Sequence, residues 1–230
     1  MRYHSHIGQD RWVLETLNFR RDAYFLEFGA FDGISSSNTL TLERDYGWSG
    51  IVVEANPTYY PDVCKNRKCI TINAALWTES RQELEMIDAH GLSSVASRMN
   101  FDGNQDGRAE ISKGLFKIDT VNPTELLRRF KAPQRIEYLS LDVEGCEFDV
   151  LKSIDFDYYQ IAMVSVEHSH VPSRQNDLRS FMLPKGYSFY ERFYDDWYFH
   201  PKYLAQLQLV NETFDPESAF KRVCDGFTVV

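Results

Sequence analysis

Blocks of apolar and polar residues alternate along this chain and predict strands and helices in turn. The predicted strands with buried, nearly continuous apolar runs lie at 24–29, 50–54, 69–76, 136–142 and 161–167. The predicted helices lie at 9–20, 35–46, from Pro57, 123–130, after Gly145 and 174–184. Alternating strands and helices predict an α/β fold with a doubly wound, mostly parallel sheet that has helices on both faces.

Two sections depart from this alternation. The polar section 78–122 contains strand-like runs at 82–88 and 115–121, separated by a glycine- and asparagine-rich loop at 100–108. We interpret it as an inserted hairpin with a lid in place of a crossover helix. Runs at 187–193 and 196–200 predict a closing antiparallel hairpin, and the tail from 211 predicts nothing definite.

Composition narrows the class of protein. The 230 residues suit one α/β domain, residues 1–230, and 43% hydrophobic residues indicate a globular chain. The formal charge of −9 disfavours nucleic acid and anionic membranes as partners. The cysteines form no C-x-x-C pair and are expected as free thiols. No apolar run reaches bilayer length and no signal-peptide core is visible, so we expect a cytoplasmic protein.

The turn after the first predicted strand carries the first candidate chemistry. Its glycines, Gly29 and Gly33, are spaced G-x-x-x-G, without the third glycine of a dinucleotide fingerprint. Glu27 and Asp32 would repel a phosphate and suit a cationic ligand. Glu54, after the second strand, can accept hydrogen bonds from ribose hydroxyls. The turn therefore favours S-adenosylmethionine, with a nucleotide-dependent oxidoreductase as the alternative.

Further polar residues follow the later strands. Asn73 is a candidate for contacting the adenine edge, and Asp88 is a rival for that role. Asp142 ends a buried strand below the expected methyl-donor position and is assigned to the active site. Glu144 and Glu147 fall near the start of the next helix, where its dipole favours carboxylates, and for Glu147 a structural role is the stronger interpretation.

Glu167 and His168 end the fifth strand and leave three interpretations open. With Asp142 they could hold a divalent cation that prefers oxygen ligands. His168 could instead act as a general base on a substrate hydroxyl. The third interpretation is a hydrogen-bonded pair that terminates the sheet.

Taken in order, these segments resemble the FkbM-type family of S-adenosylmethionine-dependent methyltransferases. The resemblance rests on SHIGQD (5–10), EFGAFDG with SSNTLTLE (27–43), GWSGIVVEANP (47–57), INAALW (72–77), YLSLDVEGCEFDVL (138–151), VSVEH (164–168) and LPKGYSF (183–189). It implies a doubly wound class I methyltransferase fold. It also implies O-methylation, often of sugar hydroxyls in glycans, polysaccharides or glycosylated natural products.

The resemblance also implies site residues. Carried over by position, the cofactor-binding set is Glu27, Gly29, Ala30, Asp32, Gly33, Asn38, Glu54, Asn73 and Ala74. A divalent ion such as Mg or Mn would be held by Asp142, Glu167 and His168, as acids at these strand ends hold a metal in related sugar O-methyltransferases. The histidine departs from a purely acidic set, and Ser5-His6 departs from the family's usual Ser-Gln.

The expected catalytic residues are Asp142, His168 and Glu144, with Asp142 or His168 as the base that takes the hydroxyl proton. The 90–114 segment, with Asn104 and Arg108, is the expected lid. Residues 194–197 are candidates for a wall that stacks on a sugar, although Trp197 fits core packing equally well. A non-catalytic binding module with a degenerate methyltransferase fold is a further alternative.

Overall fold

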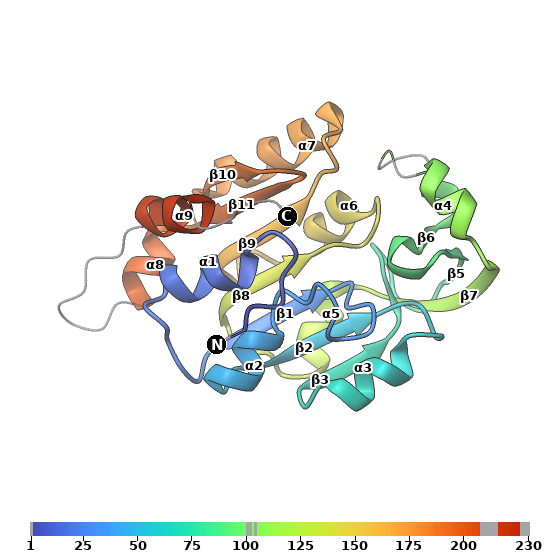
Figure 1. Ribbon diagram of the computed structural model, residues 1–230, viewed down its shortest axis with the longest axis horizontal. Coiled ribbons are helices and arrows are strands. Elements are labelled where there is room, and N and C mark those ends of the chain that lie inside the picture. Colours follow the sequence, from blue (N-terminus) through green and yellow to red (C-terminus); the bar gives the residue numbers. More distant parts are fainter. Residues whose placement is uncertain (1, 100–102, 104, 208–215, 226–230) are drawn as a thin grey trace.

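The central feature of the fold is a seven-stranded sheet with the order β10-β11-β9-β8-β1-β2-β3 (Figure 1). The computed structural model describes residues 2–99, 103, 105–207 and 216–225. The strands are β1 (Tyr24–Phe28), β2 (Ser49–Glu54), β3 (Ile70–Asn73), β8 (Arg135–Leu141), β9 (Gln160–Glu167), β10 (Ser188–Arg192) and β11 (Asp195–Phe199). The first five are parallel, while β11 is antiparallel to β9 and β10 to β11. The predicted α/β class and the closing hairpin are confirmed.

Alternate side chains of the strands enter two apolar layers, one on each face of the sheet. In β1, Phe25 packs into one layer and Leu26 into the other, because successive strand residues point to opposite faces. One face is covered by α1 (Gln9–Thr16), α2 (Leu40–Tyr46), α3 (Tyr60–Asn66), α8 (Pro201–Leu207) and α9 (Pro216–Asp225). The other is covered by α5 (Pro123–Arg129), α6 (Glu147–Lys152) and α7 (Pro172–Met182). Within the described ranges, no helix combines the length and apolar character needed to cross a membrane.

Two helices differ from their predicted bounds. The first, α1, ends at Thr16 because Asn18 and Phe19 both adopt positive φ angles that a right-handed helix excludes. The second, α2, begins at Leu40 rather than near Ser35. The polar groups of Ser37 and Asn38 bond to the carboxylate of Glu27, which holds the preceding segment as a turn.

The predicted insertion is present as a small second sheet with the order β4-β7-β5-β6, which Figure 1 shows to one side of the central sheet. Its strands are β4 (Ala75–Leu76), β5 (Glu83–Asp88), β6 (Ser94–Val95) and β7 (Gly114–Val121), with 3₁₀ turns η1 (His90–Leu92) and η2 (Ala96–Arg98) and the helix α4 (Gln105–Ile111). The antiparallel β5–β7 pair confirms the predicted hairpin.

Two predictions within the insertion need correction. The strand expected at 69–76 divides at Ala74, so that its last residues pair with β7 in the second sheet. The loop expected at 100–108 is helical from Gln105 onward, while 100–102 and Asn104 lie outside the described residues. The cysteines are free thiols, as predicted.

Candidate active site

A cleft of about 570 Å³ lies at the carboxyl ends of the parallel strands. Its walls come from the ends of β1, β2, β8 and β9, the start of β11, and the η1 turn of the insertion. The chain moves outward from β1 to β2 and β3, and then returns to the other side of β1 with β8 and β9. Ligands of open α/β sheets bind at such a reversal of strand order.

The structure brings most of the sequence-predicted site residues to this cleft. Those that line it are Glu27, Gly29, Ala30, Asn38, Glu54, Ala74, Asp142, Glu144 and Glu167. The lining does not include Asp32, Gly33, Asn73 or His168. The roles of these four residues therefore depend on contacts outside the lining of the cleft.

Asp32 and Asn73 do not line the cleft, but they hold backbone segments beside its walls through hydrogen bonds. Asp32 accepts hydrogen bonds from the backbone of Ile34 and Ser35 and from the Ser35 hydroxyl, which together close the turn containing Gly33. Burial alone would raise the pKa of Asp32, but these bonds lower it. Asn73 donates from Nδ2 to the carbonyl oxygen of Glu54 at 2.8 Å and so fixes the end of β2.

His168 lies outside the lining of the cleft. Its ring is fully buried, with Nε2 3.6 Å from Asp196 Oδ1, and Nδ1 accepts the backbone N–H of His170 at 3.1 Å. Burial lowers the pKa of His168. The expected grouping of His168 with Asp142 and Glu167 is wrong in geometry: the acids close to each other are Asp142, Glu144 and Glu167.

Glu27 is engaged in a buried ion pair that the sequence did not reveal. The Arg67 guanidinium donates to Glu27 Oε2 at 2.6 Å, and Thr39 and Ser37 also donate hydroxyl protons to this carboxylate. Arg67 lies 40 positions along the chain from Glu27, and no local pattern connects the two. Glu27 therefore borders the cleft with its charge balanced inside the protein.

Gly29 is required where the chain after β1 passes close to the residue that follows β8. Its φ is 89°, in the region that favours glycine, and a Cβ atom there would lie 1.7 Å from the carbonyl oxygen of Asp142. The neighbouring backbone N–H of Asp142 donates to the carbonyl of Phe28 at 2.9 Å. Gly29 thus allows the strand end that bears Asp142 to face the cleft.

Glu54 is buried at the end of β2 and holds the glycine turn. Its Oε2 accepts the backbone N–H groups of Ala30 at 3.1 Å and Phe31 at 2.7 Å, while Oε1 accepts that of Asn56 at 2.7 Å. Burial raises the pKa of Glu54, and these three bonds oppose the shift. An ionised carboxylate offers about four acceptor sites, so capacity remains for a ligand hydroxyl.

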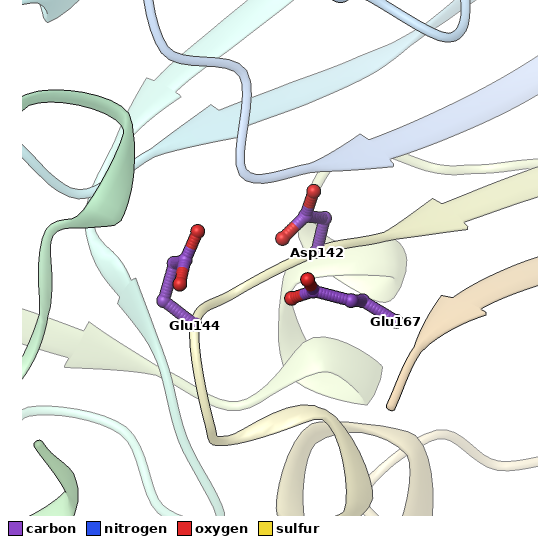
Figure 2. A group of neighbouring side chains, drawn as sticks. All are labelled: Asp142, Glu144 and Glu167. Carbon is purple, nitrogen blue, oxygen red and sulfur yellow. The ribbon is translucent and has the colours of Figure 1, made fainter. Parts of the chain in front are cut away.

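The carboxylates of Asp142, Glu144 and Glu167 form an acidic group (Figure 2). One oxygen atom from each carboxylate lies within 4.8 Å of the other two. Burial, followed by the charge of Asp142, raises the pKa of Glu167 well above its usual range. Glu167 Oε2 is buried and has no hydrogen-bond partner among the described residues. Such a group suits a divalent cation with oxygen ligands or another positively charged species.

The sequence predicted Glu144 as a site residue but did not predict its ion pair with Arg108. The φ of 54° at Glu144 turns the chain sharply after β8 and brings the side chain to the cleft. Arg108 of α4 is buried and donates from Nη2 to Glu144 Oε2 at 3.2 Å. Glu147, by contrast, accepts the backbone N–H groups of Val143 and Gly145 and pairs with Arg174, in keeping with a structural role.

The far end of the cleft contains residues of β11 and of the N-terminal segment. Tyr194 and Asp195 line it, as do Gln9 and His6. Burial and the charge of Asp142 raise the pKa of Asp195 to about 7. Trp197 is fully buried and stacks on Trp12 at 5.0 Å, which confirms core packing for that residue. The remaining candidate for the wall, Asp196, is buried and paired with Arg179.

The doubly wound sheet, the glycine turn after β1, the acid after β2 and the cleft at the strand reversal define a nucleoside-binding α/β protein of the Rossmann-like class. A family model described as the methyltransferase FkbM domain matches residues 27–189. The chain belongs to this family of S-adenosylmethionine-dependent methyltransferases.

Solved structures of methyltransferases show a distant likeness. One is a precorrin-6y C5,15-methyltransferase from Geobacter metallireducens GS-15, with 11% identity over 82% of this chain and 85% of that chain and a TM-score of 0.43. A methyltransferase from Pyrococcus furiosus shows 11% identity over 86% and 85%, with a TM-score of 0.42. A methyltransferase from Geobacter sulfurreducens, in complex with S-adenosyl-L-homocysteine, shows 9% identity over 83% and 68%, with a TM-score of 0.40. No curated protein matches the sequence.

Proposed function

We propose that this protein transfers the methyl group of S-adenosylmethionine to a hydroxyl oxygen of a sugar in a glycan, polysaccharide or glycosylated natural product. The observation that carries the proposal is the acidic group of Asp142, Glu144 and Glu167 at the strand ends beside the glycine turn. A sugar hydroxyl is a weak nucleophile, and it needs a proton acceptor or an electropositive group before it attacks the methyl carbon.

The cleft residues fit the cofactor at separate points. Glu54 has remaining acceptor capacity for ribose hydroxyls, and Gly29 keeps side-chain atoms away from the turn. Asn38 lines the cleft, and its Oδ1 is buried without a hydrogen-bond partner among the described residues. An ammonium carries three N–H donors and would satisfy this oxygen. Ala74 borders the adenine side, where the end of β3 meets β2.

The acidic group supplies the chemistry at the acceptor. Methyl transfer is an in-line displacement, so the protein has to align the acceptor oxygen and receive its proton as charge develops. Asp142 follows β8 directly and is the proposed base. Asp142, Glu144 and Glu167 would hold a divalent ion such as Mg or Mn, which when bound lowers the pKa of a coordinated hydroxyl. Arg108 of α4 donates a hydrogen bond to Glu144, and this bond connects the proposed lid to the acidic group.

Calorimetry with S-adenosylhomocysteine tests the cofactor part of the proposal. We expect a single site, and no binding at millimolar ligand would contradict the proposal. Transfer is then followed as S-adenosylhomocysteine release with neutral sugars as acceptors. Asp142→Asn and Glu167→Gln should each lower kcat at least about a hundredfold, the usual contribution of a positioned acid or base. The matched control is Glu83→Gln on β5, an exposed acid remote from the cleft lining, which should leave kcat unchanged.

Calorimetric titration of the purified protein with Mn²⁺ tests the proposed ion. We expect binding that Glu167→Gln weakens and Glu83→Gln leaves intact. Equal Mn²⁺ affinity in both variants would contradict the assignment of the ion to this acidic group.

A further inference from the structure

The part of the cleft beyond the cofactor is formed by a set of residues that we call the acceptor wall: His6, Gln9, Ser169, His170, Tyr194 and Asp195. In the sheet order, β9 and β11 lie on the opposite side of β8 from β1, β2 and β3. Because the proposed cofactor contacts are at the ends of β1 and β2, the acceptor wall faces the space that remains for the methyl acceptor.

Asp195 is the fixed polar group of this wall. It begins β11, which runs antiparallel to β9, so it lies at the edge where the parallel strands end and pairs in register with Glu167. The residue is 4% exposed. Gln9 Nε2 donates to Asp195 Oδ2 at 2.9 Å, and Trp197 Nε1 donates to the same oxygen at 3.3 Å.

The second oxygen of Asp195 has a different environment. No described residue donates a hydrogen bond to Oδ1, and Asp195 lines the cleft. Oδ1 is not among the fully buried atoms without a partner in the described residues, so it is open to the cleft, where a ligand or water can donate to it. Asp195 is therefore held by one oxygen and offers the other to a hydrogen-bond donor in the cleft.

The charges around the acceptor wall restrict the ligand. Among the described residues, those that line the cleft include Glu167 and Asp195 on this side but no lysine or arginine. Arg174 donates to the hydroxyl of Ser169 at 3.1 Å but does not line the cleft, and its guanidinium is paired with Glu147. The guanidinium groups of Arg67 and Arg108 bind Glu27 and Glu144. A phosphate or carboxylate placed here would face the carboxyl oxygens of Asp195 and Glu167 with no basic residue of the described lining to balance its charge, which is unfavourable in a partly desolvated site.

Tyr194 adds an aromatic surface to the wall. Its hydroxyl is 2.5 Å from His6 Nδ1, and the ring is half-buried, with His170 6.5 Å away in an edge-on arrangement. The phenol is thus anchored at its polar end, which leaves the ring in contact with the cleft. Aromatic rings with a tethered polar group pack against apolar faces of ligands at little loss of conformational freedom.

We propose that the acceptor is an uncharged or amino-substituted sugar without phosphate or carboxylate groups, and that Asp195 Oδ1 accepts a hydrogen bond from one of its hydroxyl or ammonium groups. This inference rests on the proposed O-methyltransferase function and specifies its substrate class. Gln9 acts as a positioning residue, because its amide holds Asp195 through Oδ2.

The test uses the full chain, S-adenosylmethionine and matched methyl glycosides of glucose, galactose and mannose. Each hexoside is supplied in neutral, 2-amino, uronate and 6-phosphate forms, and S-adenosylhomocysteine release is measured. The neutral or amino form of at least one hexose should have a kcat/KM at least about tenfold above that of its anionic forms. Equal or better turnover of an anionic form would overturn the inference, as would an inactive panel with S-adenosylhomocysteine binding intact.

Variants then test Asp195 itself. Asp195→Asn should raise the acceptor KM at least about tenfold, as expected for a lost hydrogen bond to a charged group, and should narrow the preference for neutral over uronate acceptors. The dissociation constant of S-adenosylhomocysteine should stay unchanged. Asp62→Asn, an exposed acid on α3, is the matched control. Unchanged KM and unchanged acceptor preference in folded Asp195→Asn would overturn the inference.

Gln9→Met provides a second variant in case Asp195→Asn fails to fold. It removes the shorter of the two hydrogen bonds to Asp195 Oδ2 and keeps the carboxyl group, and it should raise the acceptor KM while the dissociation constant of S-adenosylhomocysteine is retained. An unchanged acceptor KM in Gln9→Met would count against the positioning role. Failure of the proposed function itself has a different signature, which is absent S-adenosylhomocysteine binding or a methyl group recovered on nitrogen or carbon.

Discussion

Arg67 Nη1 lies 2.6 Å from Glu27 Oε2 in a buried ion pair beneath the cleft, and Arg67 Nε also donates to Glu43. The side chains of Arg67 and Glu27 are 0% and 3% exposed. Arg67→Met would leave carboxylates buried without a counter-charge, which typically destabilises a protein by about 3–5 kcal/mol. We expect a loss of this size in the free energy of unfolding, measured by urea denaturation.

Arg44→Met is the matched control for this loss. Arg44 pairs with Asp45 on the surface, where its side chain is 51% exposed, and exposed ion pairs contribute about 0–1 kcal/mol. The free energy of unfolding should change little. If Arg67→Met and Arg44→Met changed the free energy of unfolding by similar amounts, the buried ion pair would contribute no more to stability than the exposed one.

Substitution of Gly29 should also destabilise the protein, because of backbone crowding rather than the loss of a charge partner. A Cβ atom at Gly29 would lie 1.7 Å from the Asp142 carbonyl oxygen, and both strand ends would have to move apart. We expect Gly29→Ala to lower the free energy of unfolding by at least about 3 kcal/mol, in the range of the most damaging substitutions. Thermal unfolding followed by circular dichroism measures the change.

Gly107→Ala on α4 provides the comparison. The nearest atom to a Cβ atom at Gly107 is Leu92 Cδ1 at 3.7 Å, an ordinary van der Waals contact. Alanine favours helices over glycine by about 1 kcal/mol, so this variant should be as stable as the natural protein or slightly more stable. If Gly29→Ala melted like Gly107→Ala, the close approach of β1 and β8 would be refuted.

The strands of the central sheet were predicted from sequence because their signal is local. Each is a short apolar run bounded by polar or glycine residues, and the acids that follow these runs, such as Glu54 and Asp142, then fall at one edge of a parallel sheet. The glycine turn and much of the cleft lining follow from the same reasoning. Their roles in binding and catalysis remain predictions.

Features set by tertiary contacts were missed. The start of α2 depends on bonds from Ser37 to Glu27, and the ion pairs of Arg67 join residues far apart in sequence. The side chain of Glu144 joins the acidic group because its backbone adopts a left-handed conformation, and a glutamate in the sequence does not indicate that conformation. His168 follows the last residue of β9, and its ring lies beside Asp196 through a tertiary contact that the sequence does not show, while Glu167 lines the cleft.

Glu54 provides a prediction on cofactor affinity. Glu54→Gln replaces one oxygen acceptor with an amide donor, which would remove the proposed hydrogen bond to a ribose hydroxyl and disturb the bonds to Ala30 and Phe31. We expect the dissociation constant of S-adenosylhomocysteine to rise at least about tenfold, measured by calorimetry. Asp62→Asn on α3 should bind as the natural protein does. Equal affinity in Glu54→Gln would contradict ribose binding at the end of β2.

His200 predicts a dependence of stability on pH. Its ring is buried, stacks on Tyr203 at 3.8 Å, and has both nitrogens engaged: Nε2 lies 3.1 Å from the Lys185 carbonyl and Nδ1 accepts the Tyr203 backbone N–H at 3.3 Å. Burial lowers the pKa of His200 in the folded protein. In the unfolded chain the pKa is near its ordinary value of about 6.5.

The sign of the effect follows from these two pKa values. Below about pH 6.5 the unfolded chain binds a proton at His200 before the folded protein does, so the stability present above this pH is lost as pH falls. His200→Asn keeps a neutral polar group and has no such titration. The stability advantage of the natural protein over His200→Asn should therefore shrink between pH 7.5 and pH 5.5 in parallel urea denaturation. Gly107→Ala should show a difference from the natural protein that does not vary with pH, and the same constancy for His200→Asn would mean that His200 is not held neutral by the fold.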